Sequence, residues 1–475
     1  MASVLKLFGH RGHGGAFQDS RFTATICEGA KHMAKLTGIG IYKLLPKTNC
    51  GECNFPTCMA FAMQVAAKKV ALEACPYVSE AAKQELAESA APPMRTVTVG
   101  AGPRAIQMGG ETVLFRHEEK FHHPTAFAIC IKDTDDVAAE IKLIHNLKFV
   151  RSGKPVCVEL IALQQTGDGG PFLNAAKQLR ESTELPAVLM SGDLAALAGA
   201  LEILADRRPL VYAADKTNYQ QVAELSAKYK VPLAVKGETF EELADLTTKI
   251  KQAGVADMVL APVIGSMKEG LSCLTQLRRL ALEKNFRALG YPVMVLTTAE
   301  DPAQETLEAI TYACKYASIV VMRGKQPWQI LPVLTARFNI YTDPQVPNAV
   351  EAKVYKVGDA GPDSPVLVTT NFALTYFTVE GEVENSKVPA YIAAVETGGL
   401  GVLNSYADDK LTGETIAKAI KASGILTQVR HKKVIIPGLV AVLKGELEDE
   451  VGCEVVVGPE EAAGIANFLR TEWRP

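Results

Sequence analysis

The sequence lacks three features that would point to a membrane, to nucleic acid or to the outside of the cell. No apolar run is long enough to cross a bilayer, so we expect no transmembrane helix. The net charge is −3 and no basic block stands out, so nucleic-acid binding is not expected. The 10 cysteines among 475 residues do not form the dense pattern of a secreted disulfide scaffold. We therefore expect a cytoplasmic protein.

Four of the cysteines stand close together, with the spacing C-x2-C-x4-C-x16-C: Cys50, Cys53, Cys58 and Cys75. Four thiolates within such a short stretch can hold one metal centre in a reduced compartment. Structural zinc sites usually have two paired arms of cysteine or histidine, whereas this stretch has one such pair and no histidine nearby. We therefore expect a [4Fe–4S] cluster, and a structural zinc site is the alternative.

Short elements are expected around these cysteines. Gly51 allows the chain to fold tightly between two ligands, and residues 41–46 predict a helical turn before them. Pro56 suits the first turn of a helix from Thr57 to about Ala71, which would place Cys58 at its positive end. The segment 79–95 is rich in Ala, Glu and Pro and predicts a helix that fades into a linker.

The length of the chain suits about three domains. The expected divisions are a leader that is disordered or not native (1–32), a cluster domain (33–90), a linker (91–104), a barrel (105–345) and an α/β domain (350–475). Two short β runs over 96–115 surround Gly100 and Gly102. We expect a hairpin there, because the G-x-x-G and helix of a nucleotide site do not follow.

Apolar strand-like runs, each followed by a helical pattern, recur through the middle of the chain. Continuous apolar strands that alternate with helices indicate a parallel sheet covered on both faces. Eight such repeats predict a (β/α)8 TIM barrel. The runs cover residues 126–131, 156–161, 187–190, 210–214, 232–235, 258–261, 293–297 and 318–322.

The carboxyl ends of barrel strands are where chemistry would lie. Most of the acids there come directly before a helix, so N-capping explains them, and no catalytic pair is evident. We therefore expect a scaffold or a subunit-docking role for the barrel. The polar residues at these ends are Asp133, Asp135, Asp193, Asp215, Glu238, Thr297, Thr298 and Arg323.

The last part of the chain again alternates between strands and helices, and it is too short for another barrel. Strand-like runs cover 366–370, 391–395, 433–436 and 454–457, and helical patterns cover 372–384, 412–423, 439–450 and 460–470. This predicts a small doubly wound α/β domain, in which a ligand binds at the carboxyl ends of the strands. Glycines at three of those ends could let backbone approach a large flat ligand, or could be ordinary turn glycines.

The order of a cluster module, a barrel and a small α/β domain resembles the large (gamma) subunit of the corrinoid/iron-sulfur protein of the reductive acetyl-CoA pathway. The resemblance extends from about Met33 to the C-terminus. It implies an N-terminal [4Fe–4S] domain, a central TIM barrel and a C-terminal Rossmann-like, doubly wound corrinoid-binding domain. The segments that carry it are IYKLLPKTNCGEC, CPYVS, YTDPQVP, TTNFALTY and IPGLVAVLKG.

The resemblance also implies a methyl carrier that forms a heterodimer with a smaller corrinoid/iron-sulfur protein subunit. Its corrinoid would accept a methyl group from methyltetrahydrofolate, or from an archaeal pterin, through a methyltransferase, and deliver it to acetyl-CoA synthase. A low-potential donor such as ferredoxin would pass electrons to the cluster, and the cluster would reduce Co(II) to Co(I). The implied corrinoid contacts are Thr369, Thr375, Gly399, Leu400, Gly401, Val402 and Ala462.

One missing motif bears on the lower face of the cobalt. Many methyl-carrying corrinoid domains use Asp-x-His-x-x-Gly, whose histidine binds cobalt, and this motif is absent. His431 is the only histidine after residue 145, and its setting between basic residues resembles a surface position. We therefore predict base-off cobalt without a protein nitrogen ligand. Two alternatives stay open, namely a barrel that itself binds a methylpterin and transfers its methyl group, and a zinc-clamped interaction scaffold.

Overall fold

The computed structural model describes residues 38–67, 69–79 and 92–475 and separates into two compact units. The first unit comprises residues 1–149 and 156–341, and the second comprises residues 150–155 and 342–475. The expected leader and residues 80–91 of the expected linker helix lie outside the described residues. Among the described residues, no helix combines the length and apolar character that a membrane span requires.

Residues 38–79 form a small module with its own apolar core, which includes Ile41 and Phe61. Helix α3 ends at Ala66, not near Ala71 as the sequence predicted. After this end the chain turns into a 3-10 turn, which returns Cys75 to the core with 4% of its surface exposed. The elements of the module are α2 (Gly38–Leu44), α3 (Cys58–Ala66) and η2 (Leu72–Ala74).

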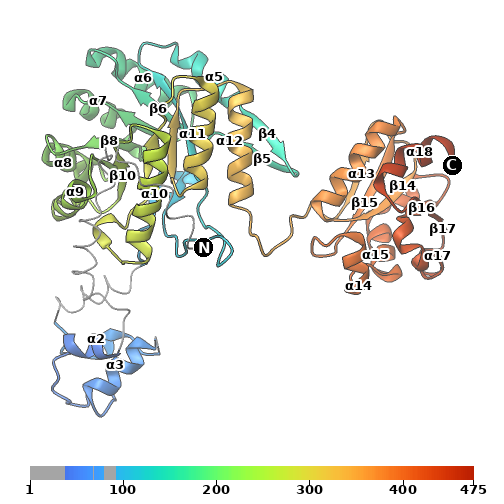
Figure 1. Cartoon of the computed structure of the whole chain (residues 1–475), viewed down its shortest axis with the longest axis horizontal. Coiled ribbons are helices and arrows are strands. Elements are labelled where there is room, and N and C mark those ends of the chain that lie inside the picture. The colour runs from blue at the N-terminus through green and yellow to red at the C-terminus, as the bar shows by residue number, and fades with distance from the viewer. Residues whose placement is uncertain (1–37, 68, 80–91) are drawn as a thin grey trace, which may run out of the picture. The chain divides into compact units, whose positions relative to one another are not determined.

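Eight parallel strands, each followed by a helix, form the barrel, so the predicted (β/α)8 fold is confirmed. Figure 1 shows the outer helices around the strands. The strands are β3 (Ala126–Lys132), β6 (Leu160–Gln164), β7 (Ala187–Met190), β8 (Leu210–Ala214), β9 (Leu233–Gly237), β10 (Met258–Pro262), β11 (Met294–Leu296) and β12 (Ile319–Met322). The helices are α5 (Val137–Asn146), α6 (Gly169–Ser182), α7 (Leu194–Leu204), α8 (Tyr219–Tyr229), α9 (Phe240–Gln252), α10 (Met267–Leu282), α11 (Pro302–Cys314) and α12 (Pro327–Ile340).

The sheet closes where β10 meets the chain before β11. A parallel bridge joins Leu260 to Val293, and the Leu260 amide donates to the Pro292 carbonyl at 2.8 Å. The hairpin of β1 (Val97–Val99) and β2 (Ile106–Met108) is antiparallel and packs its apolar side chains into the barrel interior. Short 3-10 turns occur at η3 (Gly102–Arg104), η4 (Ala205–Arg207) and η5 (Arg287–Leu289).

The expected strand over 156–161 is wrong, because this run belongs to two elements. Residues Ser152 and Gly153 both have positive φ and reverse the chain, so the start of the run pairs back in a two-stranded sheet. That sheet consists of β4 (Lys148–Arg151) and β5 (Lys154–Cys157), and the barrel strand β6 begins only at Leu160.

The second unit is built on a five-stranded sheet in the order β13-β15-β14-β16-β17. All neighbours are parallel except the edge strand β13, which the sequence patterns did not predict. The strands are β13 (Val354–Val357), β14 (Val366–Thr370), β15 (Ala390–Val395), β16 (Lys433–Ile436) and β17 (Glu454–Val457).

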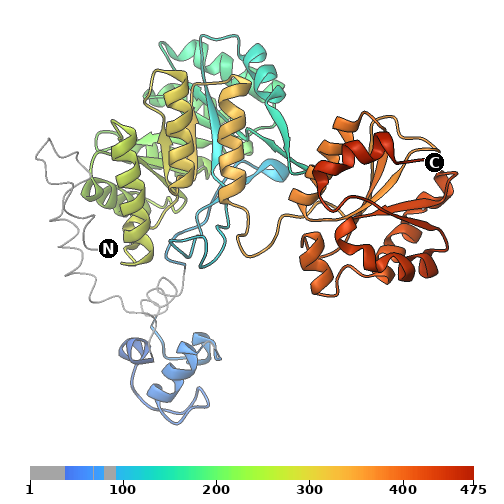
Figure 2. The same cartoon turned by 45° about the vertical axis from the view of Figure 1, so that its right-hand side comes forward.

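Helices cover both faces of this sheet, as Figure 2 shows for the orange and red part of the chain. Helices α13 and α18 pack together on one face, and α15 and α17 pack together on the other. The elements are α13 (Ala373–Ser386), α14 (Val402–Ala407), α15 (Gly413–Ser423), α16 (Ile425–Gln428), η6 (Gly438–Leu443), α17 (Lys444–Val451), η7 (Ala462–Gly464) and α18 (Ile465–Thr471).

Candidate cofactor sites

The four predicted metal ligands all lie in the N-terminal module. Cys53, Cys58 and Cys75 are buried in the same apolar core, with 8%, 6% and 4% of their surfaces exposed, and Cys50 is exposed. Gly51 has φ of +77°, a left-handed conformation that favours glycine and lets the chain turn between the first two cysteines. The Asn54 amide closes this turn by donating to the Gly51 carbonyl at 2.9 Å.

Helix α3 begins at Cys58, one residue after the predicted start at Thr57, so Cys58 lies at the positive end of the helix as predicted, and it forms a reciprocal pair with Asn49. The Asn49 side-chain oxygen accepts a hydrogen bond from the Cys58 amide at 2.8 Å, and the Asn49 amide donates to Cys58 Sγ at 3.4 Å. Thr57 caps the same helix by accepting from the Ala60 amide at 3.1 Å. Both the helix terminus and the N–H···S hydrogen bond stabilise negative charge on this sulfur.

The donor set of this module suits an iron–sulfur cluster. Four thiols and no histidine lie in residues 38–79, and thiolates are the usual ligands of such clusters. In the described part of the chain, no group of three or more His, Cys, Asp or Glu side chains is close enough to hold a single metal ion. The structure therefore places the four cysteines in one module, with their sulfur atoms not gathered around a common point.

The C-terminal unit has a cavity of about 380 Å³ at the carboxyl ends of its strands. It opens between β14 and β16, where the chain reverses direction because β15 lies on one side of β14 and β16 on the other. Ligands of open α/β sheets bind at such switch points. Its walls come from the ends of β14, β16 and β17, from the first turns of α13 and α14, and from α18.

Thr369 lines this cavity and has a hydroxyl without a partner. Its side chain is 1% exposed, and Oγ1 makes no hydrogen bond in the structure. A buried polar atom without a partner is unfavourable, and native proteins usually satisfy it with protein, water or ligand. Because this hydroxyl also belongs to a residue that lines the cavity, a ligand with a polar group at this wall would satisfy it. Glu460 is the single charged residue among the lining residues, all of which are described.

The structure brings five of the seven predicted corrinoid contacts to this cavity: Thr369, Thr375, Gly401, Val402 and Ala462. Gly401 lies beside Thr375, since a Cβ atom added at Gly401 would be 3.8 Å from Thr375 Oγ1. Gly399 and Leu400 do not line it. Gly399 has φ of +74°, and an added Cβ would lie 3.0 Å from the Pro347 side chain.

Glycine at the end of β16 serves packing between loops. A Cβ atom on Gly438 would lie 2.7 Å from the Gly458 carbonyl oxygen, and the Gly438 amide donates to the Pro459 carbonyl at 3.0 Å. The loops after β16 and β17 can approach each other this closely because Gly438 has no side chain. Close packing of these two loops therefore explains Gly438, and contact with a ligand is not needed to explain it.

Sequence patterns missed several residues of the wall. Leu374, Leu403 and Leu439 line the cavity although 68%, 54% and 40% of their surfaces are exposed. Each of these leucines lies near the start of a helix, in α13, α14 or η6, and an apolar side chain there that packs on nothing else is a usable signal of a binding surface.

His431 lies at the other end of the sheet, just before β16. Its Nε2 is 2.9 Å from the Ser364 carbonyl oxygen, and its Nδ1 accepts from the Lys433 amide at 2.9 Å. The ring also packs edge-on against Trp473. The side chain is therefore partly buried and engaged, unlike the predicted surface residue. No histidine is among the residues that line the cavity.

The barrel also has a cavity, which is polar and measures about 540 Å³, at the carboxyl ends of β6 to β9. The sequence predicted that most of the acids at the strand ends cap helices. This prediction is correct for Asp193 and wrong for Asp133, Asp135, Asp215 and Glu238. Asp133 instead accepts from the Thr166 amide at 3.0 Å, and Asp215 accepts from the Thr217 amide at 2.8 Å. The Asp133 Oδ2 atom has no partner, but Asp133 is not among the residues that line this cavity.

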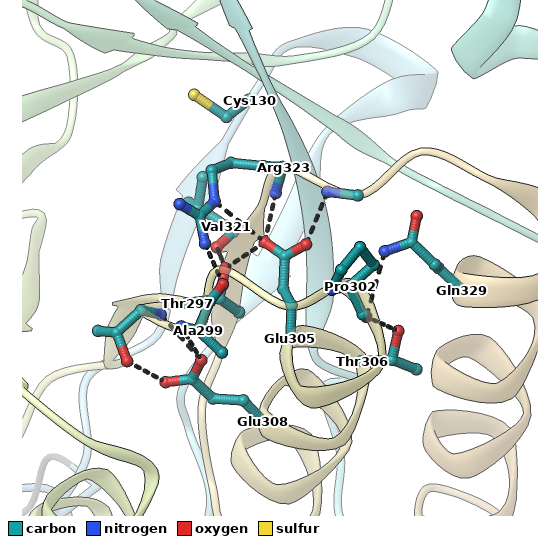
Figure 3. Close-up of polar contacts among 12 residues, drawn as sticks. Cys130, Thr297, Ala299, Pro302, Glu305, Thr306, Glu308, Val321, Arg323 and Gln329 are labelled. Atoms are coloured by element: carbon teal, nitrogen blue, oxygen red, sulfur yellow. Dashed lines mark hydrogen bonds and ion pairs between the residues drawn. The ribbon is translucent and has the colours of Figure 1, made fainter.

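Two buried glutamates of α11 bind the polar residues that follow β11 and β12 (Figure 3). Glu305 accepts from Thr297 Oγ1 at 2.7 Å and from the Arg323 amide at 2.8 Å. Glu308 accepts from the Thr298 amide at 2.8 Å and from the Ala299 amide at 2.9 Å. These carboxylates are 3% and 2% exposed. Thr297, Thr298 and Arg323, which the sequence placed at strand ends, are thus bonded within the protein.

Comparison with protein families gives two matches. The model described as CO dehydrogenase/acetyl-CoA synthase delta subunit matches residues 96–469. A model for an Fe-S cluster segment matches residues 45–77, which contain all four cysteines discussed above.

Two curated relatives align over nearly their whole length. The corrinoid/iron-sulfur protein large subunit of Moorella thermoacetica is 47% identical over 439 residues, which cover 92% of this chain and 98% of that protein. The acetyl-CoA decarbonylase/synthase complex subunit gamma of Methanothermobacter thermautotrophicus is 37% identical over 452 residues, which cover 92% and 98%.

Among solved structures, dihydropteroate synthase from Thermus thermophilus is 16% identical, covers 50% of this chain and 97% of that chain, and has a TM-score of 0.36. The length and identity of the sequence matches are decisive, and the chain belongs to the family of the corrinoid/iron-sulfur protein large subunit and the acetyl-CoA decarbonylase/synthase gamma subunits.

Proposed function

We propose that the chain is a methyl carrier, with a corrinoid held by the C-terminal unit and a [4Fe–4S] cluster held by Cys50, Cys53, Cys58 and Cys75. The observation that carries the proposal is the cavity at the switch point of the second sheet, with the unpartnered hydroxyl of Thr369 in its wall. The relatives agree with this assignment, since they are a corrinoid/iron-sulfur protein large subunit and a gamma subunit of the acetyl-CoA decarbonylase/synthase complex.

The residues of this chain would hold and orient the cofactor. When bound, a corrinoid supplies a cobalt ion that takes up and releases a methyl group, and the iron–sulfur cluster supplies the electron that restores the accepting state. Thr369 would hydrogen-bond a polar group of the ligand, while Thr375, Gly401, Val402 and Ala462 would contact its surface. Leu374, Leu403 and Leu439 would exclude water.

Histidine ligation from this chain has no support in the cavity, because its lining contains no imidazole. His431, the last histidine of the chain, is bonded at the opposite end of the sheet. We therefore propose that this chain supplies no imidazole to the cobalt and, as a separate part of the proposal, that the corrinoid is bound base-off. Such surroundings would make the lower oxidation state of cobalt easier to reach.

The proposed partners follow from this role. A second, smaller subunit would complete the corrinoid site, a methyltransferase would supply the methyl group from methyltetrahydrofolate or an archaeal pterin, and acetyl-CoA synthase would receive it. A low-potential donor such as ferredoxin would reduce the cluster, which suits a cytoplasmic setting. The barrel would act as a scaffold, because its strand-end threonines and Arg323 are bound by Glu305 and Glu308.

Metal analysis of the full chain, co-purified without oxygen with its smaller subunit, tests the proposal. We expect cobalt together with about four irons per chain. Cys53→Ala should lose iron and the ability to restore oxidised cobalt with the physiological donor, while it keeps the corrinoid. Cys314→Ala, outside the module at the end of α11, is the matched control and should keep both metals. Zinc alone in the wild-type chain would refute the proposal and favour a zinc-clamped scaffold.

A further inference from the structure

The loop between β15 and α14, residues 396–401, is held by one buried side chain, Asn371, which lies in a segment that carries the family resemblance but for which the sequence predicted no role. We propose that Asn371 positions this loop and thereby sets the wall of the cavity at Gly401 and Val402. The inference rests on the proposed function, because it assigns to Asn371 an effect on corrinoid binding. Asn371 follows β14 directly and is 2% exposed.

Both ends of the Asn371 amide group are engaged with the loop. Its Oδ1 accepts from the Thr397 amide at 3.0 Å, from the Thr397 hydroxyl at 3.0 Å and from the Gly399 amide at 3.1 Å. Its Nδ2 donates to Glu396 Oε2 at 3.0 Å. One side chain therefore makes four hydrogen bonds to three residues of the loop.

The backbone of Asn371 is fixed as well. Its amide donates to the Val395 carbonyl at 2.9 Å, and its carbonyl accepts from the Val350 amide at 2.8 Å. These bonds join the end of β14 to the end of β15 and to the chain before β13. The side chain of Asn371 is thus held by rigid elements, and the loop takes its position from them.

The loop needs such an anchor because of its glycines. Gly398 and Gly399 have φ of +67° and +74°, and glycine has the largest conformational freedom of any residue. Glu396 adds one bond, since its Oε1 accepts from the Gly398 amide at 2.8 Å. The loop continues into α14 through Gly401, which lines the cavity, so a shift of the anchor would move that wall.

Two substitutions separate the parts of the network. Asn371→Asp keeps an oxygen that can accept from Thr397 and Gly399, but it replaces the donor to Glu396 with a second carboxylate oxygen about 3.0 Å away. Asn371→Ala removes all four bonds and leaves buried donors unsatisfied. Asn218→Asp is a matched control in the barrel, where the side chain accepts from the Asp215 amide at 2.8 Å and donates to the Ala213 carbonyl at 3.3 Å.

The test compares full-length variants in corrinoid-loaded and corrinoid-free form. We expect both Asn371 variants to release corrinoid at least about tenfold faster than wild type, which corresponds to the loss of one or two hydrogen bonds. The difference in melting temperature between loaded and free protein should shrink in both. Asn218→Asp should release corrinoid at the wild-type rate and keep the wild-type difference in melting temperature between loaded and free protein.

The outcomes distinguish the inference from the proposed function. If both Asn371 variants melt at lower temperature but keep the wild-type release rate and difference, Asn371 is merely structural and the inference is wrong. If Asn371→Ala does not fold, Asn371→Asp decides alone. All variants are co-purified with the smaller subunit; if the wild-type pair takes up no corrinoid the proposed function fails, whereas a wild-type pair that binds corrinoid with unchanged release in both Asn371 variants overturns the inference alone.

Discussion

Replacing Thr369 by valine should stabilise the corrinoid-free protein and weaken its hold on the corrinoid. The hydroxyl of Thr369 is buried without a partner, and an unsatisfied buried polar group costs about 1–3 kcal/mol. Valine has nearly the same shape and no polar atom. We therefore expect the free energy of unfolding of the corrinoid-free C-terminal unit to rise by about 1 kcal/mol, which raises its melting temperature by about 2–6 °C.

The effect on binding should have the opposite sign. In the wild type the hydroxyl gains its hydrogen bond only when the ligand enters, so binding recovers the free energy lost in the free protein. Thr369→Val cannot make this gain, and we expect its corrinoid affinity to fall about tenfold, the equivalent of about 1.4 kcal/mol. Equilibrium titration followed by absorbance measures the affinity, and thermal unfolding of the corrinoid-free chain measures the stability.

Thr370 provides a control of the same chemistry in the next position. Its hydroxyl is also buried without a partner, with 0% of the residue exposed. Successive side chains of a strand point to opposite faces, and Thr370 does not line the cavity. Thr370→Val should therefore raise stability to a similar extent and leave corrinoid affinity unchanged. Equal affinities of the two variants, or lower stability of Thr369→Val, would refute the assignment of Thr369.

Three further predictions concern the other parts of the chain. The backbone amide of Asn49, held in a left-handed conformation, donates to Cys58 Sγ, and hydrogen bonds to the sulfurs help to set the potential of a cluster. Asn49→Ala disfavours this conformation and should make the midpoint potential of the cluster more negative in a redox titration. Asn49→Gly keeps the left-handed backbone and should shift the potential less. Glu308→Ala should lower the free energy of unfolding by about 3 kcal/mol or more because it leaves several buried donors unsatisfied, and Tyr312→Phe by only about 1 kcal/mol in chemical denaturation. Burial and, to a lesser extent, nearby positive charges lower the pKa of His145, so the unfolded chain takes up a proton there more readily than the folded chain. The melting temperature should therefore fall as the pH drops from 7.5 to about 5.5, and His145→Gln should flatten this pH profile.

The barrel could be predicted because its evidence is repetitive. Each strand is a short apolar run bounded by a helical pattern, and eight repeats outweigh an error in any one. The error at residues 156–161 shows the limit of this approach. An apolar run predicts a buried strand, but the turn at Ser152 and Gly153 decides that the first part of this run pairs back in a hairpin.

Side-chain roles were harder to predict than elements, since they depend on contacts between distant segments. Asp133 precedes a helix and resembles a cap, yet it binds Thr166 on the neighbouring strand end. The same limit applies to Asn371, whose partners lie 25 to 28 residues away. Glu305 and Glu308 did leave a signal, because they share the buried face of α11 with Ala309 and Tyr312.

The cavity at the strand ends of the barrel and the one lined by Thr369 differ in what their polar atoms are bonded to, and this difference supports the proposal that the second one holds the cofactor. At the barrel, Asp193 caps a helix and Asp215 binds its own turn, so the acids that line the cavity already have partners. In the C-terminal unit, the Thr369 hydroxyl has none, and the wall around it is largely apolar. A protein that carries a reactive ligand without acting as acid or base needs few polar groups, each directed at the ligand. The C-terminal cavity has this character, and the barrel cavity does not.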